Sequence, residues 1–341
     1  MKKKLVSIIM MVVLCATTLL AGCGKEEQGS TQAASNGKDP ADVLVLKVGD
    51  DEVYLNEVNY YALAFLSSMG VADGTDLSTY FSEQYPTMDE AYKAQLLMQI
   101  RQSKILYLKA VEEGISLTDD EVAEVDSEAD KFMENYDKDK QAKFGLDKDL
   151  LTHVFTQIYM IRKLESQLAS NVEQTETVSY GTIEKLVFLR VKIDESGNAV
   201  TDADGNYEYL SEDEQAQKKA QAEEALARLK DGEDLDDLIA EYDLAATSGT
   251  THATSDSIKE TYGLSDGEIS DVIENEYGYT IIKVVASEDQ DYTDSVNSYY
   301  QNSATQEAVK NQEQEWFDAF PISDDDVETD VWNAFSLQEF L

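Results

Sequence analysis

The chain has few of the side chains that carry metal, redox and nucleophilic chemistry. Its 341 residues include two cysteines, Cys15 and Cys23, and two histidines, His153 and His252. Cys15 lies in an N-terminal segment that we expect to be removed, and Cys23 follows that segment and would be modified, so no thiol is left for a disulfide or a nucleophile. Zinc sites use several histidine or cysteine ligands, and the two histidines are far apart in sequence. We therefore predict no metal site, no cofactor and no catalytic residue.

Positive charge is also scarce. The chain carries 27 lysines and arginines against 69 aspartates and glutamates, a net charge of −42, which becomes −45 without the three lysines of the N-terminal segment. Such a surface repels nucleic acid and anionic lipid, so we predict no nucleic-acid partner. It is compatible with basic clients, although acidic residues spread along helices usually form a solvated face. Apolar residues make up 42% of the chain, which excludes wholesale disorder.

The N-terminus has the layout of a secretory signal. Lys2 to Lys4 precede an apolar run from Leu5 to Leu20, and the small residues Ala21 and Gly22 precede Cys23. This pattern resembles a bacterial lipoprotein signal, which implies removal of residues 1–22 and a diacylglycerol on the Cys23 sulfur. Two acyl chains anchor a protein stably where one binds marginally. An uncleaved transmembrane anchor is the alternative, but a spanning helix needs about 20 apolar residues. We expect a lipid-anchored protein on the extracytoplasmic face of the cell membrane.

A polar, flexible tether over 23–42 precedes a helical region that we assign to 43–174. A strand at 43–48 and a return strand at 53–54 flank a turn. Helical patterns follow at 56–69, from about Met88 to Gly114, after a capping box at Thr118 to Glu121, and at 149–169. The last helix has one apolar stripe, which predicts core or, alternatively, a packing face for a partner: Leu150, Val154, Ile158, Ile161, Leu164 and Leu168.

The periodicity changes near Thr175. Strand patterns cover 178–193 and two runs within 268–285, and helical patterns cover 211–232, 234–242 and 295–320. Two turn units lie at 194–198 and 202–206. The second has the start of a calcium loop, but Tyr207 replaces the required glycine and Asp213 the final glutamate, so a hairpin loop is favoured. The tail, 321–341, is acidic with a few aromatic residues that we expect to be exposed.

Two segments of the second half resemble the parvulin family of peptidyl-prolyl isomerases. Residues 222–242 are similar to the helix, glycine turn and short helix of that family, with Leu235 where the family usually has phenylalanine. Residues 264–284 are similar to its last turn and strand, including Tyr277-Gly278-Tyr279-Thr280-Ile281-Ile282. Residues 43 to about 171 resemble the helical chaperone domain of the SurA and PrsA foldases.

These resemblances imply an α+β fold. The helical, SurA N-terminal-like domain would carry an inserted parvulin-like α/β domain at 175–288. Residues 289–341 would form a C-terminal helix and acidic tail that return to the first domain, with Trp316 packing on it.

The departures from the family concern the isomerase chemistry. By the resemblance, the family's two histidine positions are occupied by Leu186 and Thr280, and the stretch from Asp243 to Tyr262 is short and polar. We expect His252 to lie in a loop there and not to substitute. Rotation about the X–Pro bond faces a barrier of about 18–20 kcal/mol, which an enzyme lowers by preferring the transition state. Without these groups we predict weak or no isomerisation.

We therefore expect an extracytoplasmic chaperone that binds unfolded or nascent exported polypeptides through apolar grooves. Its candidate client-binding residues are Phe65, Phe155, Phe188 and Tyr279. An active prolyl isomerase is the first alternative, and an envelope scaffold lipoprotein without client activity is the second. A solute-binding lipoprotein is disfavoured because the alternating strand–helix pattern of that class is missing.

Overall fold

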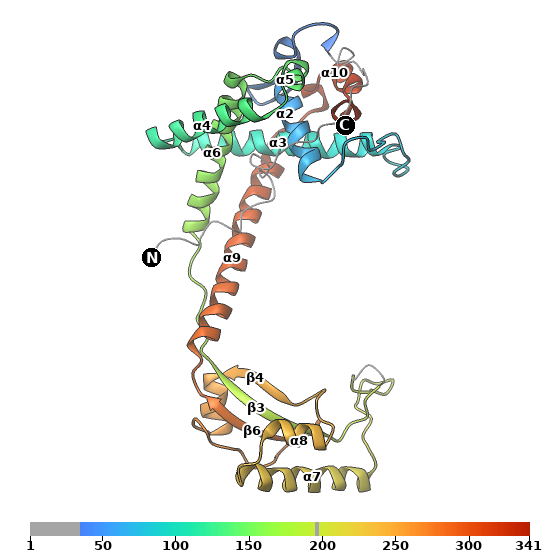
Figure 1. The fold of residues 1–341 in the computed structure, drawn as a ribbon, viewed down its shortest axis with the longest axis vertical. Helices are drawn as coiled ribbons and strands as arrows, with labels where there is room; N and C mark the ends of the chain where they lie inside the picture. Colours follow the sequence, from blue (N-terminus) through green and yellow to red (C-terminus); the bar gives the residue numbers. More distant parts are fainter. Residues whose placement is uncertain (1–34, 195–197) are drawn as a thin grey trace. The chain divides into compact units, whose positions relative to one another are not determined.

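The computed structural model describes residues 35–194 and 198–341, which divide into two compact units. The first unit holds the described residues up to Glu173 and those from Ser303 onward, and the second holds Gln174–Asn302. The α+β class is confirmed, since helices dominate the first unit and a four-stranded sheet organises the second (Figure 1). The predicted signal peptide, Cys23 and most of the predicted tether lie outside the described residues.

The first unit is mostly helical and begins with a short hairpin. Its elements are β1 (Leu44–Val48), β2 (Asp51–Tyr54), α2 (Leu55–Ser68), α3 (Met88–Glu112), α4 (Asp119–Asn135), α5 (Lys138–Phe144), α6 (Lys148–Ser170), the C-terminal part of α9 (Gln290–Ala319) and α10 (Thr329–Ala334). The capping box predicted at Thr118 begins α4, where the Thr118 hydroxyl and the Glu121 carboxylate each accept from the other residue's backbone N–H. Our sequence analysis did not predict α5.

The end of the predicted tether is part of this unit. Residues Pro40–Asp42 form a 3₁₀ turn. They approach Gly145, which ends α5 with a φ of +66° and where an added Cβ would lie 3.0 Å from the Pro40 side chain. Glycine meets both demands because it accepts the left-handed conformation and leaves room for the proline.

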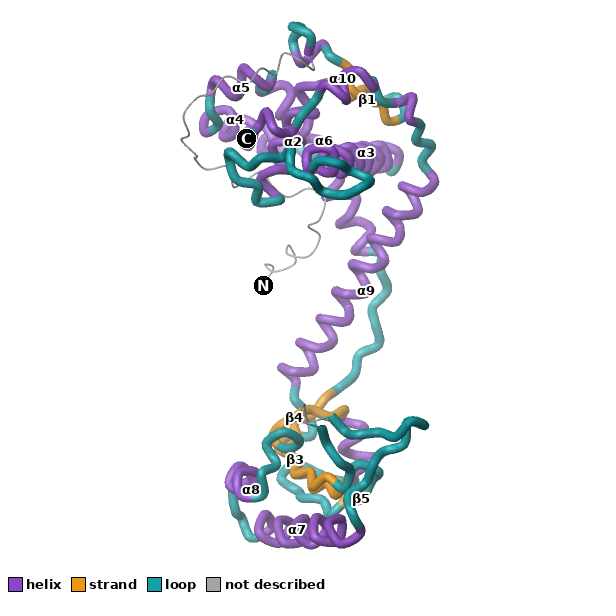
Figure 2. The backbone as a smooth tube through the Cα atoms, turned by 90° about the vertical axis from the view of Figure 1, so that its right-hand side faces the viewer, coloured by secondary structure: helices purple, strands orange, loops and turns teal. Residues whose placement is uncertain are grey.

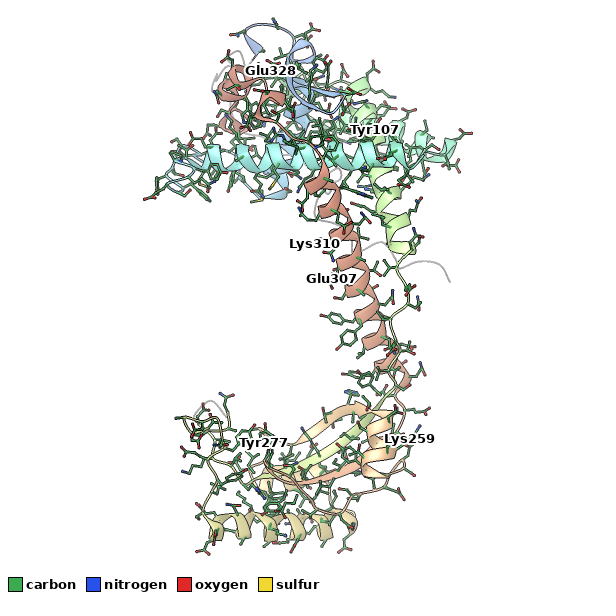
Figure 3. All side chains as sticks on the ribbon, turned by 180° about the vertical axis from the view of Figure 1, so that it is seen from behind. Tyr107, Lys259, Tyr277, Glu307, Lys310 and Glu328 are labelled. Atoms are coloured by element: carbon green, nitrogen blue, oxygen red, sulfur yellow. The ribbon has the colours of Figure 1, made fainter. Side chains whose placement is uncertain are left out.

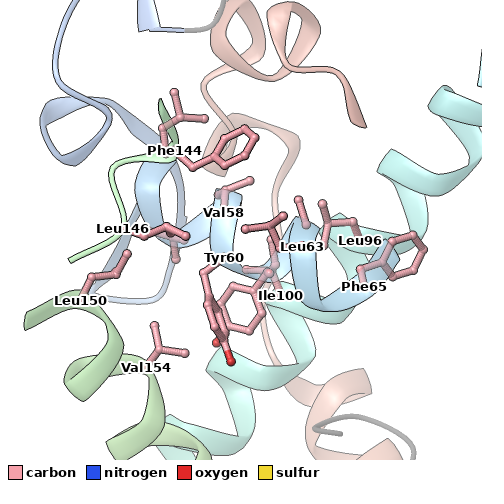
Figure 4. Close-up of a cluster of buried hydrophobic side chains, with 14 of the residues drawn as sticks. Val58, Tyr60, Leu63, Phe65, Leu96, Ile100, Phe144, Leu146, Leu150 and Val154 are labelled. Atoms are coloured by element: carbon pink, nitrogen blue, oxygen red, sulfur yellow. The ribbon is translucent and has the colours of Figure 1, made fainter. Parts of the chain in front are cut away.

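Helix α2 lies in the middle of the core of the first unit. Figure 4 shows its Val58, Tyr60 and Leu63 surrounded by side chains from α3, α6 and the α5–α6 connection. Three residues of the apolar stripe of α6, Leu150, Val154 and Ile158, belong to this core. Five of the six residues of the stripe are buried: Leu150, Val154, Ile158, Ile161 and Leu164.

The C-terminal tail contradicts our expectation of exposed aromatic residues. Leu337 is fully buried, and Phe335 and Phe340 are 4% and 5% exposed. The Phe340 ring stacks on Phe144 with centroids 4.3 Å apart. The backbone N–H of Leu337 donates to the Asp89 carboxylate at 2.7 Å. The tail is therefore a core element, because apolar side chains gain free energy by leaving water. Trp316 packs on this same core, as the resemblance implies.

The second unit is built on one antiparallel sheet with strand order β4-β3-β6-β5. Its elements are β3 (Tyr180–Leu189), α7 (Glu212–Lys230), α8 (Leu235–Glu241), β4 (Gly249–Thr254), a π-helical turn η2 (Ser257–Tyr262), β5 (Ile273–Glu274), β6 (Gly278–Ala286) and the start of α9. Helices α7 and α8 cover one face of the sheet (Figures 1 and 2). Helix α9 begins at Gln290, five residues before the predicted start at Ser295.

The start of α9 is attached to the segment that leads into β3. Side chains of α9 pair with three backbone N–H groups of that segment: Thr175 donates to Gln301 at 2.6 Å, Val178 to Asn297 at 3.0 Å and Tyr180 to Thr293 at 2.9 Å. The second unit therefore extends to Asn302, whereas our predicted domain boundary lies at 288.

No helix within residues 35–194 and 198–341 is both long and apolar enough to span a membrane.

Candidate functional site

The two faces of the sheet in the second unit differ in how they are covered. Successive side chains of a strand point to opposite faces. Leu186 and Phe188 of β3 and Tyr279 and Ile281 of β6 share the face that packs on α7 and α8, and each is at most 4% exposed. This inner face is a closed core. It also joins the two parvulin-like segments, since Leu229, Leu235 and Leu238 of the first pack in the same cluster as Tyr279 and Ile281 of the second.

Gly278 allows the close contact between β3 and β6 at this point. An added Cβ on Gly278 would lie 2.2 Å from the Phe188 carbonyl oxygen, so no other residue fits without a shift of the backbone. Close packing of the two strands therefore explains why the Glu-Tyr-Gly-Tyr part of the motif has a glycine at position 278.

The outer face is only partly covered. Ile258 of η2 packs there with Ile183, Ile282 and Val284. Further along the strands, Val187 stands opposite Thr280 and Lys185 opposite Ile282, and the side chains of Lys185, Val187 and Thr280 are half-buried. Figure 3 marks the two ends of the sheet, with Lys259 on η2 at one end and Tyr277 in the turn before β6 at the other. We call this part of the outer face, formed by Lys185, Val187 and Thr280, the outer platform.

The structure does not bring Leu186 and Thr280 together. Leu186 is opposite Ile281 on the inner face, whereas Thr280 is opposite Val187 on the outer face. Two groups that act on one substrate need to share a face. At this level of the open outer face the polar side chains are the Thr280 hydroxyl and the Lys185 ammonium. Neither of these two side chains is an imidazole.

His252 is not in a loop, which corrects our expectation. It lies on β4 opposite Thr182 of β3. Its ring stacks on Tyr292 of α9 with centroids 3.5 Å apart, and its Nε2 lies 3.6 Å from a carboxylate oxygen of Asp289. The hydroxyl of Thr182 donates to that same oxygen at 2.7 Å.

This cluster joins the sheet to the start of α9. The Thr182 hydroxyl, the Tyr292 backbone N–H and the neighbouring His252 hold the pKa of Asp289 below its ordinary value. By strand alternation, Thr182 lies on the same face as Leu186. His252 therefore belongs to a structural contact and does not serve the outer platform.

The four predicted client-binding residues are all core residues. Phe65, Phe155, Phe188 and Tyr279 are between 0% and 4% exposed. Because a side chain in a closed core cannot contact a client, we correct this prediction. Aromatic residues are the largest apolar side chains and fill cores first, and our sequence analysis could not separate that use from a surface use.

Large apolar side chains are exposed elsewhere. Tyr80 and Phe81 are 72% and 52% exposed in the loop before α3, and Tyr299 and Tyr300 are 69% and 56% exposed on α9. Our sequence analysis missed both pairs. The signal for the first was available, since Tyr80 and Phe81 stand among serine, threonine and acidic residues with no apolar periodicity around them.

No group of three or more histidine, cysteine, aspartate or glutamate side chains suited to a metal occurs in the described part of the chain. The segment that resembles a calcium loop is a hairpin turn. Thr201 bridges Tyr207. The Asp202 carboxylate accepts the backbone N–H groups of Asp204 and Asn206, both at 2.9 Å, which occupies one of its oxygens within the turn.

Comparison with known proteins finds similarity among solved structures only. No family model matches the chain. No curated protein matches it. The chain is similar to the peptidylprolyl isomerase PrsA of Bacillus cereus, with 14% identity over 76% of this chain and 98% of the other, at a TM-score of 0.30.

PrsA of Bacillus subtilis is similar with 18% identity, 87% and 98% coverage and a TM-score of 0.20. A SurA-like chaperone of Campylobacter jejuni is similar with 11% identity, 81% and 93% coverage and a TM-score of 0.23. By name, these proteins are PrsA foldases and SurA-like chaperones, the group that the sequence motifs also resemble.

Proposed function

We propose that this protein is a membrane-anchored extracytoplasmic chaperone that binds unfolded exported polypeptides, and that its parvulin-like unit isomerises prolyl bonds weakly or not at all. One observation carries the proposal. The two segments that resemble the parvulin family, 222–242 and 264–284, are far apart in sequence and fold into one packed layer, α7 and α8 against β6. This packing supports a parvulin-like framework, in which Leu186 and Thr280 occupy the positions that the resemblance assigns to histidine.

The weakness in catalysis follows from the outer platform. An isomerase must hold a proline ring and a twisted carbonyl more tightly than the planar amide. At the level of Thr280 the platform offers a half-buried valine, a threonine and a lysine. These side chains can contact an extended polypeptide, and they provide no enclosed environment in which the amide loses its double-bond character.

The test compares two activities of the full mature chain. We expect suppression of aggregation of an unfolded client at stoichiometric amounts, and acceleration of a model X–Pro peptide well below that of a histidine-bearing parvulin measured alongside. Robust isomerisation would promote the enzyme alternative. Failure to suppress aggregation of several clients would leave the scaffold alternative.

The anchor is tested separately. Replacing Cys23 by alanine should release the protein from membranes or leave it unprocessed, because the proposed attachment is a lipid on that sulfur. A variant that fractionates with membranes and incorporates labelled fatty acid like the parent would contradict the anchor. Replacing Cys15 by alanine is the matched control, since this thiol lies inside the predicted signal and its loss should change neither property.

A further inference from the structure

The exposed pair Tyr80 and Phe81 lies on one arm of a hairpin, directly before the turn Ser82–Tyr85 that forms its tip. The backbones of Tyr80 and Thr87 bridge, the Phe81 N–H donates to the Pro86 carbonyl at 3.3 Å and the Ser82 N–H donates to the Tyr85 carbonyl at 2.9 Å. This hairpin lies beyond the N-terminal end of α3 (Figure 1). Its hydrogen bonds hold Tyr80 and Phe81 as neighbours on this arm, and both side chains are exposed to water.

The base of the hairpin is held firmly by the core. Leu77 is fully buried, and its N–H donates to the Gln338 side chain of the tail at 2.7 Å. Its carbonyl accepts from the Asp89 N–H at 3.0 Å. The tip is therefore presented by an anchored loop. A ligand that covers these two aromatic rings gains the free energy of removing them from water.

The charged residues of the hairpin and of its neighbouring sequence are all acidic. From Asp50 to Tyr92 the sequence contains no lysine or arginine, and within 70–92 it contains five acidic residues. Glu83 is exposed between the two strands of the hairpin. Lys93, the first basic residue after this stretch, is buried. A ligand that brings apolar side chains to this tip therefore meets a negative field, which favours partners with positive charge.

We propose that the hairpin formed by residues 77–89 captures extended segments of unfolded clients in which apolar side chains are flanked by lysine or arginine. This inference rests on the proposed chaperone function and names its substrate class. The rings of Tyr80 and Phe81 cover the apolar side chains of the client, and the acidic residues of the loop attract its flanking charges. Acidic segments are rejected by the same field, which gives the selectivity.

The experiment measures binding of three fluorescent dodecapeptides to the full mature chain. All share a Leu-Leu-Phe-Leu centre, and their ends carry lysines, serines or glutamates. We expect the lysine peptide to bind about tenfold more tightly than the glutamate peptide at 0.1 M salt. This difference should shrink at 1 M salt, where the screening length falls from about 10 Å to about 3 Å.

Two variants separate the apolar and the charged contributions. Combining Tyr80→Ser with Phe81→Ser should weaken binding of the lysine and serine peptides by about tenfold, as expected for exposed aromatic anchors. Glu83→Gln should leave the serine peptide unchanged and reduce the preference for lysine over glutamate by about two- to threefold. The matched control combines Tyr299→Ser with Tyr300→Ser, which removes two equally exposed aromatic residues from α9 and should change nothing.

The outcomes distinguish this inference from the proposed function. If the parent binds the peptides and the hairpin variant binds them like the control, the inference is overturned and the chaperone proposal stands. If the parent binds none of the peptides and suppresses no aggregation, the chaperone proposal falls with it. Loss of binding to phosphatidylglycerol vesicles in the hairpin variant, with peptide binding unchanged, would make the tip a membrane contact and also overturn the inference.

Discussion

The face to which a side chain points decides the role of each candidate residue in the second unit. Leu186 and Thr280 are both at positions that the resemblance assigns to histidine, yet one is fully buried against α7 and α8 and the other is half-buried on the opposite face. The same holds for Phe188 and Tyr279, whose size suggested client contact and whose orientation makes them core. Residue type alone therefore does not define a site on a sheet.

Histidine substitutions test this assignment of faces. Leu186→His should lower the free energy of unfolding of the second unit by about 2–5 kcal/mol, because it replaces a fully buried apolar side chain by a polar ring. Thr280→His should change it by less than about 1 kcal/mol, since a half-exposed ring can stay hydrated. Urea unfolding of both variants provides the measurement. Equal losses would mean that the two positions share one environment.

At the scale of elements, one buried lysine, Lys104, links several helices and a strand of the first unit. The Lys104 side chain on α3 is 0% exposed, and its ammonium lies 3.0 Å from Asp51 of β2 and 2.6 Å from Glu57 of α2. It also donates to the Gln157 side chain of α6 at 2.9 Å. One cation therefore links α3 with three other elements, and its loss would leave two carboxylates without their partner in or near the core.

Replacing Lys104 by methionine should therefore be costly even though methionine has a similar length. We expect the free energy of unfolding to fall by about 3–5 kcal/mol, the usual cost of leaving a buried charge without its partner. Lys47→Met is the matched control, because Lys47 pairs with Glu52 at 2.6 Å on the surface. There the loss should be below about 1 kcal/mol. Thermal unfolding of both variants would show the contrast, and similar midpoints would contradict it.

The contact between α6 and the C-terminal part of α9 contains two neighbouring glutamates, Glu165 and Glu313, whose pKa values are both raised. Burial and the neighbouring Glu313 raise the pKa of Glu165 to about 8, against the opposing effect of Arg162 on the same helix. Burial also raises the pKa of Glu313, although its hydrogen bond with Glu165 opposes the increase. Glu165 is 7% exposed, and one oxygen of Glu313 is buried without a partner. The buried pair is therefore favoured when Glu165 stays protonated and its carboxyl O–H donates a hydrogen bond to the Glu313 carboxylate.

This proton makes the stability of the first unit fall as pH rises. The folded pKa of Glu165, about 8, is above its ordinary value of 4.5, so the folded state holds one more proton than the unfolded state between these values. The stabilisation is complete below about pH 4.5 and is lost as pH rises through about 8. The slope is at most about 1.4 kcal/mol per pH unit, one proton.

Substitution by glutamine isolates this contribution. Glu165→Gln keeps a donor toward Glu313 without a proton to lose, so its unfolding free energy should vary less with pH between 5 and 8 than that of the parent. Glu307→Gln removes the same charge from an exposed position of α9 (Figure 3) and should keep the slope of the parent. Parallel curves for all three proteins would show that the pair does not hold a proton.

At the scale of the whole molecule, α9 is shared by the two units. Its residues up to Asn302 belong to the second unit, and those from Ser303 belong to the first. The first part pairs with the backbone of 175–180 through Gln301, Asn297 and Thr293. A domain boundary drawn before this helix therefore removes hydrogen-bond partners from the sheet unit.

Two fragments test the contribution of α9. A fragment of residues 174–302 should fold alone, because it holds its own sheet and both helices that cover it. A fragment of 175–288 lacks Asp289 and Tyr292 as well as the three side chains that pair with backbone N–H groups. The thermal unfolding midpoint of the 175–288 fragment should be lower than that of the 174–302 fragment by about 5 °C or more. Equal midpoints would show that α9 adds nothing to this unit, and a failure of both to fold would contradict its independence.

Patterns along the chain were enough to predict most helices and their ends. The capping residues at Thr118 and Ser211, the apolar stripe of α6 and the glycine after α3 act between near neighbours, so the sequence contains their signal directly. The two parvulin-like segments were likewise recognisable from their residues alone. The α+β class followed from these resemblances, and the change of periodicity near Thr175 indicated where the second unit begins.

The tertiary structure decided what those patterns could not. Strand β4 has no apolar alternation and forms because β3 offers it a backbone partner, which places His252 in the sheet. The tail is buried because Phe144 and Asp89, which are distant in sequence, receive it. Register between β3 and β6 set the faces of Leu186 and Thr280. Each of these outcomes depends on pairing across about 70 to 250 residues, whereas periodicity reports only on neighbours within a few turns.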